Sequence, residues 1–153
     1  MRAGLGYDIH KLQEGSHIVL GGVKIPYDKS FVAHSDGDVL VHAIIDGILG
    51  ALGERDIGYH FPDTDPKYKG ANSLELLKCV MEKFEPKIIN LDSNIIAQKP
   101  KLMPHIENMK ENLSNILKID KSLISIKAKT KEGLDATGEC RAIEANCIIL
   151  LEK

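Results

Sequence analysis

An apolar pattern at helical spacing between residues 39 and 52 constrains the fold of this chain more than any other feature. It predicts an amphipathic helix of about four or five turns, whose apolar face must be covered by another layer. Ser35, followed three residues later by Asp38, resembles a capping box and predicts where the helix begins. The apolar positions that carry the pattern are Val39, Leu40, Ala43, Ile44, Ile48 and Leu52.

The segments around this helix predict a sheet and two more helices. Gly21-Gly22 between short apolar runs predicts a hairpin with a primed turn, which Pro26 ends. A second helix is expected from Asn72 or Ser73 to about Phe84, and a third begins near Pro104. The expected strands cover residues 4–10, 18–20, 23–25, 88–97, 123–130 and 142–151. We therefore expect one α+β domain over residues 1–153, a two-layer structure with helices packed on one face of a sheet.

The composition excludes several classes of protein. The chain has 43% apolar and 27% charged residues, which argues against disorder, and its net charge of −2 without a basic arm argues against nucleic-acid binding. The longest apolar stretches are too short to span a membrane, and the first residues lack the apolar segment of a signal peptide. Three scattered cysteines without a C-x-x-C pair fit a reducing compartment. We expect a cytoplasmic protein with neither nucleic acid nor membrane as partner.

A carboxylate and two imidazoles form a candidate metal site. Asp8 and His10 are two residues apart in a predicted strand, so both side chains point to one face, and His42 lies on the helix expected to cover that sheet. This ligand set suits a catalytic Zn²⁺ with one open position, or an open Fe(II) site. Asp46, one helical turn further on, could orient His42 or receive a substrate hydroxyl. The alternative is a surface Asp-x-His and a polar seam on a partly exposed helix.

Other polar residues indicate a phosphorylated substrate. His34 and Ser35 precede a helix N-terminus, where free N–H groups suit phosphate, although Ser35 could simply cap the helix. Lys127, Lys129 and Lys131 alternate along a predicted strand and its exit, either as a cationic line or as a solvated face. Glu132 beside these lysines suits Mg²⁺, which keeps most of its waters and binds phosphate oxygens.

Five segments together resemble one known family. They are Gly6-Tyr7-Asp8-Ile9-His10, His34-Ser35-Asp36-Gly37-Asp38 with His42, Asp56-Ile57-Gly58, Phe61-Pro62-Asp63-Thr64-Asp65-Pro66 and Ile95-Ile96-Ala97-Gln98-Lys99-Pro100-Lys101. In order and spacing, over essentially the whole chain, they resemble the 2-C-methyl-D-erythritol 2,4-cyclodiphosphate synthase family of the non-mevalonate isoprenoid pathway. The resemblance implies a homotrimer with active sites between subunits, and cyclisation of 4-diphosphocytidyl-2-C-methyl-D-erythritol 2-phosphate with release of CMP.

The resemblance also implies roles for individual residues. It places Zn²⁺ on Asp8, His10 and His42, and Mg²⁺ or Mn²⁺ on Glu132. It assigns transition-state stabilisation to His34 and Thr130, the methylerythritol phosphate to Ser35, residues 56–58 and residues 61–65, and the cytosine to residues 97–103. The substrate-binding residues expected in full are Asp8, His10, His34, Ser35, Asp56, Ile57, Gly58, Phe61, Pro62, Asp63, Thr64, Asp65, Ala97, Gln98, Lys99, Pro100, Lys101, Leu102, Met103, Lys129, Thr130, Lys131 and Glu132.

The chain departs from the family pattern after Glu132. Ala136 stands where the family commonly has Phe, and Glu139 stands where it commonly has Arg, with Arg141 two residues on.

Two other functions share the metal ligands. One is a zinc-dependent phosphohydrolase, in which metal-bound water attacks, and the other is a non-catalytic, zinc-stabilised trimeric interaction module.

Overall fold

The computed structural model describes residues 1–152, so Lys153 of the predicted domain lies outside the described residues. The strands are β1 (Arg2–Glu14), β2 (His17–Leu20), β3 (Val23–Pro26), β4 (Lys29–Val32), β5 (Ile88–Ile96), β6 (Ile124–Lys129) and β7 (Ala142–Leu151). The α-helices are α1 (Val39–Leu52), α2 (Ile57–His60), α3 (Ser73–Phe84), α4 (Ile106–Leu117) and α5 (Asp135–Gly138). Short 3₁₀ turns cover Pro66–Tyr68, Met103–His105 and Lys121–Leu123.

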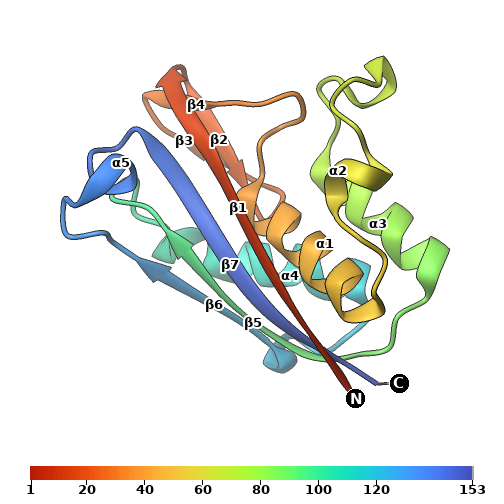
Figure 1. Ribbon diagram of the computed structural model, residues 1–153. Coiled ribbons are helices and arrows are strands. Elements are labelled where there is room, and N and C mark those ends of the chain that lie inside the picture. Colours follow the sequence, from red (N-terminus) through yellow and green to blue (C-terminus); the bar gives the residue numbers. More distant parts are fainter. Residues whose placement is uncertain (153) are drawn as a thin grey trace.

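A five-stranded sheet in the order β4-β1-β7-β5-β6 forms one layer of the molecule. Its pairs are antiparallel except β5 and β6, which run parallel through the crossover that contains α4. The long helices lie on one side of this sheet, α1 over β1 and β7 and α4 against β6, while α3 packs on both helices (Figure 1). The predicted α+β arrangement, with helices on one face of a sheet, is confirmed.

Side chains alternate between the two faces of the sheet. On β7, Ile143, Cys147 and Ile149 face the helices and are buried in the core. Of the described helices, only the short α5 contacts the opposite face, where Thr137 donates to Glu144 near one end of β7, and large apolar side chains are exposed on the rest of it. Leu5, Tyr7, Ile9 and Ile148 have exposed fractions of 71%, 51%, 43% and 59%. This open face is unusually apolar for a surface in contact with water.

The central helix α1 differs from the prediction in two respects. Nearly all of its residues are buried, because α3 covers the side that the sheet leaves free, so the predicted polar face does not exist. Its N-cap is Asp38 rather than Ser35: the carboxylate of Asp38 accepts the N–H of Val41 at 3.1 Å. The same carboxylate accepts the N–H groups of Gly21 at 3.0 Å and Gly22 at 2.8 Å, which joins the β2–β3 turn to the helix.

The other predicted elements are found within a few residues of their expected bounds. The hairpin turn has positive φ at both glycines, 56° at Gly21 and 73° at Gly22, as a primed turn requires. Asn72 caps α3 by accepting the N–H of Leu74 at 2.9 Å. Three short elements, β4, α2 and α5, were not predicted from the sequence. Within residues 1–152, no helix has both the length and the apolar content needed to cross a bilayer.

Candidate metal centre and substrate cavity

The backbones of β1 and α1 touch, and this contact places the polar end of β1 beside the helix. A Cβ added to Gly4 would lie 1.8 Å from the carbonyl oxygen of Gly47, and one added to Gly6 would lie 1.7 Å from that of Ala43. Only glycine fits at such a distance. Asp8 and His10 follow on the same face of the strand, which runs toward the N-terminal end of α1. There they meet His42.

Asp8, His10 and His42 bring three donor atoms to one point. Oδ2 of Asp8 lies 3.1 Å from Nε2 of His10 and 3.0 Å from Nδ1 of His42, and the two nitrogens are 3.4 Å apart. Donors about 2.0–2.2 Å from a tetrahedral Zn²⁺ stand roughly 3.3–3.6 Å from each other. Three electron-rich atoms so close together need a cation or protons between them, and the spacing fits the smaller divalent metals. The cluster can therefore hold a metal ion.

Charge interactions in the cluster favour the ionised carboxylate. Burial alone would raise the pKa of the Asp8 carboxyl, but hydrogen bonds from His10 and His42 outweigh it, and the pKa lies below the ordinary value. Burial likewise opposes the charged form of His42, yet the neighbouring Asp8 raises the pKa of this imidazole. The site is thus arranged for positive charge between Asp8 and the two rings.

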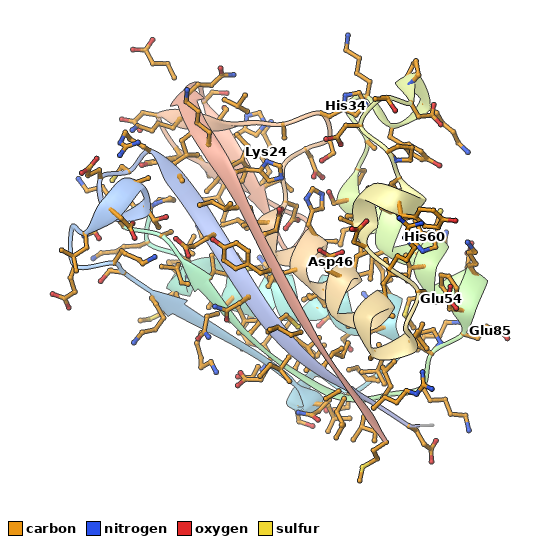
Figure 2. The ribbon with its side chains drawn as sticks, in the orientation of Figure 1. Lys24, His34, Asp46, Glu54, His60 and Glu85 are labelled. Atoms are coloured by element: carbon orange, nitrogen blue, oxygen red, sulfur yellow. The ribbon has the colours of Figure 1, made fainter. Side chains whose placement is uncertain are left out.

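A cavity of about 170 Å³ opens beside the three donors. His34 reaches it from the loop before α1, and its Nε2 donates to the carbonyl oxygen of Asp65 at 3.3 Å (Figure 2). Nine of the predicted residues line the cavity: Asp8, His10, His34, Ser35, His42, Ile57, Gly58, Phe61 and Asp63. Tyr68 and Leu76 complete the lining and were not predicted. Pro62, Thr64 and Asp65 lie in the same loop but are not among the lining residues.

Asp46 fixes the wall of this cavity. Its Oδ1 accepts the N–H of Ile57 at 2.7 Å, which ties the start of α2 to α1 (Figure 2). Burial raises the pKa of the Asp46 carboxyl, and the nearby charge of Asp56 adds to the effect. Asp56 itself caps α2 by accepting the N–H of Tyr59 at 2.9 Å. Of the two roles considered for Asp46, orienting His42 is wrong, because the bonded partner is the backbone of Ile57.

Comparison with known proteins identifies the family of the chain. The sequence model of the YgbB family matches residues 1–152. This chain belongs to the YgbB family. Two curated relatives are named 2-C-methyl-D-erythritol 2,4-cyclodiphosphate synthase. The one from Clostridium perfringens is 55% identical over 156 residues and covers 100% of both chains. The one from Pelobacter propionicus is 53% identical over 154 residues, covering 99% of this chain and 98% of its own.

Solved structures agree with this YgbB-family assignment. The structure described as "IspF (Plasmodium falciparum) CDP complex" is 44% identical, has a TM-score of 0.84, and matches 98% of this chain and 94% of that one. The bifunctional IspDF from Campylobacter jejuni is 40% identical with a TM-score of 0.92. That match covers 97% of this chain but only 41% of the bifunctional chain.

Nine further predicted residues of this YgbB-family chain line a second cavity, of about 710 Å³. This cavity shares no residue with the first. Gln98 serves partly as a brace, because its Oε1 accepts the N–H groups of Lys131 and Gly133, each at 3.2 Å. The lining includes every residue from Ala97 to Met103 together with Lys129 and Thr130, and adds Tyr27, Pro104 and Ala128.

The expected cationic line is largely neutralised. Nζ of Lys127 lies 2.6 Å from Asp92, and Nζ of Lys131 lies 3.0 Å from Glu144 and 3.1 Å from Asp135. Lys131 therefore holds α5 against β7 and is not among the residues that line either cavity. Glu132 is exposed, with φ of 56° in the left-handed region, and also lies outside both linings.

The departures from the family pattern lie in and just after α5. Ala136 is inside this short helix. Glu139 and Arg141 bind each other, since Oε2 of Glu139 accepts from Nη2 and Nε of Arg141, both at 2.8 Å. Both side chains are exposed, so the pair leaves their charges mutually compensated on the surface.

Proposed function

We propose that this chain is a 2-C-methyl-D-erythritol 2,4-cyclodiphosphate synthase. It would convert 4-diphosphocytidyl-2-C-methyl-D-erythritol 2-phosphate to 2-C-methyl-D-erythritol 2,4-cyclodiphosphate and CMP. The observation that carries the proposal is 55% identity, over the full length of both chains, to a relative of that name. The cluster of Asp8, His10 and His42 beside a polar cavity supports it independently of that identity.

The proposed reaction needs no protein nucleophile, because the substrate carries its own. An oxygen of the 2-phosphate forms a bond to the β-phosphorus, and the bond from that phosphorus to the oxygen bridging to CMP breaks. The electron pair of the broken bond leaves on CMP. The main barrier is the repulsion between anionic groups, so the protein has to fold the substrate and compensate its charge.

Residues around both cavities, together with the exposed Glu132, would supply that compensation. Asp8, His10 and His42 would hold Zn²⁺, and Glu132 would hold Mg²⁺ or Mn²⁺. Such ions, when bound, act as Lewis acids that polarise phosphate oxygens. His34 and Thr130 would donate hydrogen bonds to the phosphate oxygens as their charge changes. The Asp56–Gly58 turn and the loop of residues 61–65 would hold the methylerythritol part, and residues 97–103 would hold the cytosine.

A homotrimer is proposed as the active form. Two observations support it: the two cavities share no residue within one chain, and the open sheet face exposes Leu5, Tyr7, Ile9 and Ile148. If neighbouring subunits cover these apolar side chains, the cytosine cavity of one subunit can complete the metal site of the next. Each active site would then lie between two subunits.

Residues 1–153 are proposed to form one domain and to act in the cytoplasm. The three cysteines, all free in the structure, support a reducing compartment.

Phosphorus NMR of the product tests the proposed reaction. Metal-replete protein incubated with the substrate should give CMP, whose own monoester resonance is assigned with authentic CMP, and a cyclic diphosphate, which adds no further monoester resonance. A zinc-dependent phosphohydrolase would instead give a linear product that retains a monoester. A non-catalytic interaction module would leave the substrate unchanged. Either of these last two results would overturn the proposal.

A further inference from the structure

A buried serine contacts the far nitrogen of the His42 ring. Ser73, the first residue of α3, has an exposed fraction of 0%. Its Oγ lies 2.8 Å from Nε2 of His42, on the side of the ring opposite the Nδ1 atom that faces Asp8. The two residues are 31 positions apart in the sequence.

The other partner of Ser73 determines the direction of this hydrogen bond. The Oγ of Ser73 also forms a hydrogen bond with Oδ1 of Asp36. Asp36 acts as an acceptor, since its oxygens accept the backbone N–H of Ser73 at 2.9 Å and of Asp38 at 3.1 Å. The single hydroxyl proton of Ser73 therefore goes to Asp36. Only lone pairs remain on Ser73 Oγ toward His42, so Nε2 of His42 must carry a proton and donate it.

Ser35 offers a competing arrangement that the distances disfavour. Its Oγ lies 3.3 Å from Nε2 of His42 and accepts the N–H of Gly37 at 3.2 Å. Were Ser35 to donate to Nε2, the lone pairs of Nε2 and Ser73 Oγ would face each other at 2.8 Å. With the proton on Nε2, both serine oxygens can instead accept from it. Nδ1 is then left as the ring atom with a free lone pair.

We propose that Ser73, oriented by Asp36, is a positioning residue for the metal centre. The chain Asp36–Ser73–His42 holds the His42 ring in its Nε2–H form and thereby presents the Nδ1 lone pair to the metal. This inference rests on the proposed zinc site of Asp8, His10 and His42. It adds two residues from outside the ligand set, neither of which belongs to the expected substrate contacts.

Zinc affinity measured by competition with a chelator tests the proposal. In Ser73→Ala the affinity should fall about 10- to 100-fold, the usual cost of losing an outer partner of a metal-binding histidine. Ser93→Ala is the matched control. Ser93, on β5, is also buried, with an exposed fraction of 1%. Its hydroxyl donates to the carbonyl oxygen of Ser125 on β6 at 2.9 Å. Its zinc affinity should stay within about twofold of the unaltered protein.

The outcomes separate this proposal from the proposed function. An unaltered protein that binds no zinc overturns the metal centre itself. An unaltered protein that binds zinc tightly, together with a Ser73→Ala variant of equal affinity, overturns only the role of Ser73. Equal losses in Ser73→Ala and Ser93→Ala would also overturn it, because they would reflect general destabilisation.

Proton NMR of the unaltered protein provides the test if Ser73→Ala does not fold. In zinc-loaded protein with ¹⁵N-labelled histidine rings, the Nε2 proton of His42 should exchange slowly with water, because it is buried and hydrogen-bonded. Zinc on Nε2, or an Nε2 proton that exchanges as fast as that of an exposed imidazole, would contradict the proposed chain.

Discussion

At the scale of single residues, His42 is the position on which the proposed chemistry most depends. It is the candidate metal donor supplied by α1, and its side chain is almost entirely buried. We expect the zinc affinity of His42→Ala to fall by more than the roughly 10- to 100-fold that follows the loss of a residue hydrogen-bonded to a metal-binding histidine. We also expect this variant to lose nearly all turnover. Metal analysis after gel filtration and a CMP-release assay would measure both.

His17 offers a matched control for this variant. It lies on β2, where its Nδ1 contacts the hydroxyl of Ser16 at 3.0 Å, and takes no part in the cluster. His17→Ala should keep its zinc and its activity. A fully active His42→Ala protein without tightly bound metal would refute the ligand assignment.

Glu144 should make stability depend on pH. Burial opposes its ionisation, but the hydrogen bonds from Thr137 at 2.6 Å and Lys131 at 3.0 Å prevail and lower the pKa of the Glu144 carboxyl. A carboxyl whose pKa is lowered by folding contributes stability above its unfolded pKa of about 4.3, and this contribution is lost as the pH falls through the folded value.

Glu144→Gln should therefore lower the free energy of unfolding by about 1–2 kcal/mol at pH 7 and flatten its decline below about pH 4.5. Urea unfolding at a series of pH values would measure both effects. Glu152→Gln, which removes an exposed ion pair with Lys87, should change little. If the free energy of unfolding of Glu144→Gln fell with decreasing pH as steeply as that of the unaltered protein, Glu144 would not be a source of the pH dependence.

At the scale of elements, the contact between α1 and α2 positions the cavity wall. Because Asp46 accepts the N–H of Ile57 next to the cavity, Asp46→Ala should loosen the Asp56–Gly58 turn while leaving the metal donors in place. We expect KM to rise about tenfold, the value of one such hydrogen bond, with zinc content unchanged.

The conservative variant separates positioning from charge in this contact. Asp46→Asn retains an oxygen that can accept from Ile57, so its KM should stay close to that of the unaltered protein. Steady-state kinetics on both variants, with zinc content determined alongside, would distinguish the two. An unaltered KM in Asp46→Ala would remove this residue from the positioning of the cavity.

At the scale of the whole molecule, the apolar open face of the sheet should control assembly. Leu5→Lys places a charge on this face, where Leu5 is 71% exposed in the isolated chain. We expect the variant to dissociate from trimer to monomer in light scattering, and to lose turnover while keeping zinc. Leu123→Lys, outside the sheet face at the 3₁₀ turn before β6, should remain trimeric. An active Leu5→Lys monomer would contradict active sites shared between subunits.

The sequence predicted the large elements well and their surroundings less well. The expected bounds of β7 are those observed, because its long, mostly apolar run is bounded by the charged residues Arg141 and Glu152. The short β4 was missed, since four residues carry too little pattern. The burial of α1 could not be predicted, because it depends on α3 covering its far side.

The candidate site divides in the same way. The Asp8–His10 spacing and the family motifs predicted the cluster of candidate metal donors that the structure brings together, because these residues lie within regular elements. Ser73 was missed because its contact with His42 joins residues far apart in the chain, and no local pattern marks it. One further signal was available in the sequence. Gly4, Gly6, Asp8 and His10 are spaced two apart and so share one face of β1, which indicates that this face approaches another backbone closely before it carries the polar side chains.

The meeting of β1 and α1 backbone to backbone has an evolutionary and an engineering consequence. No layer of side chains separates the two elements at Gly4 and Gly6. Changes in side-chain volume elsewhere in the core therefore do not alter the distance between strand and helix at this point. The spacing of the donors is therefore set by main-chain atoms, which substitutions elsewhere in the core leave in place as long as Gly4 and Gly6 are kept. A redesign of the preferred ion would therefore have to exchange donor types, because the gap between strand and helix offers no room for adjustment.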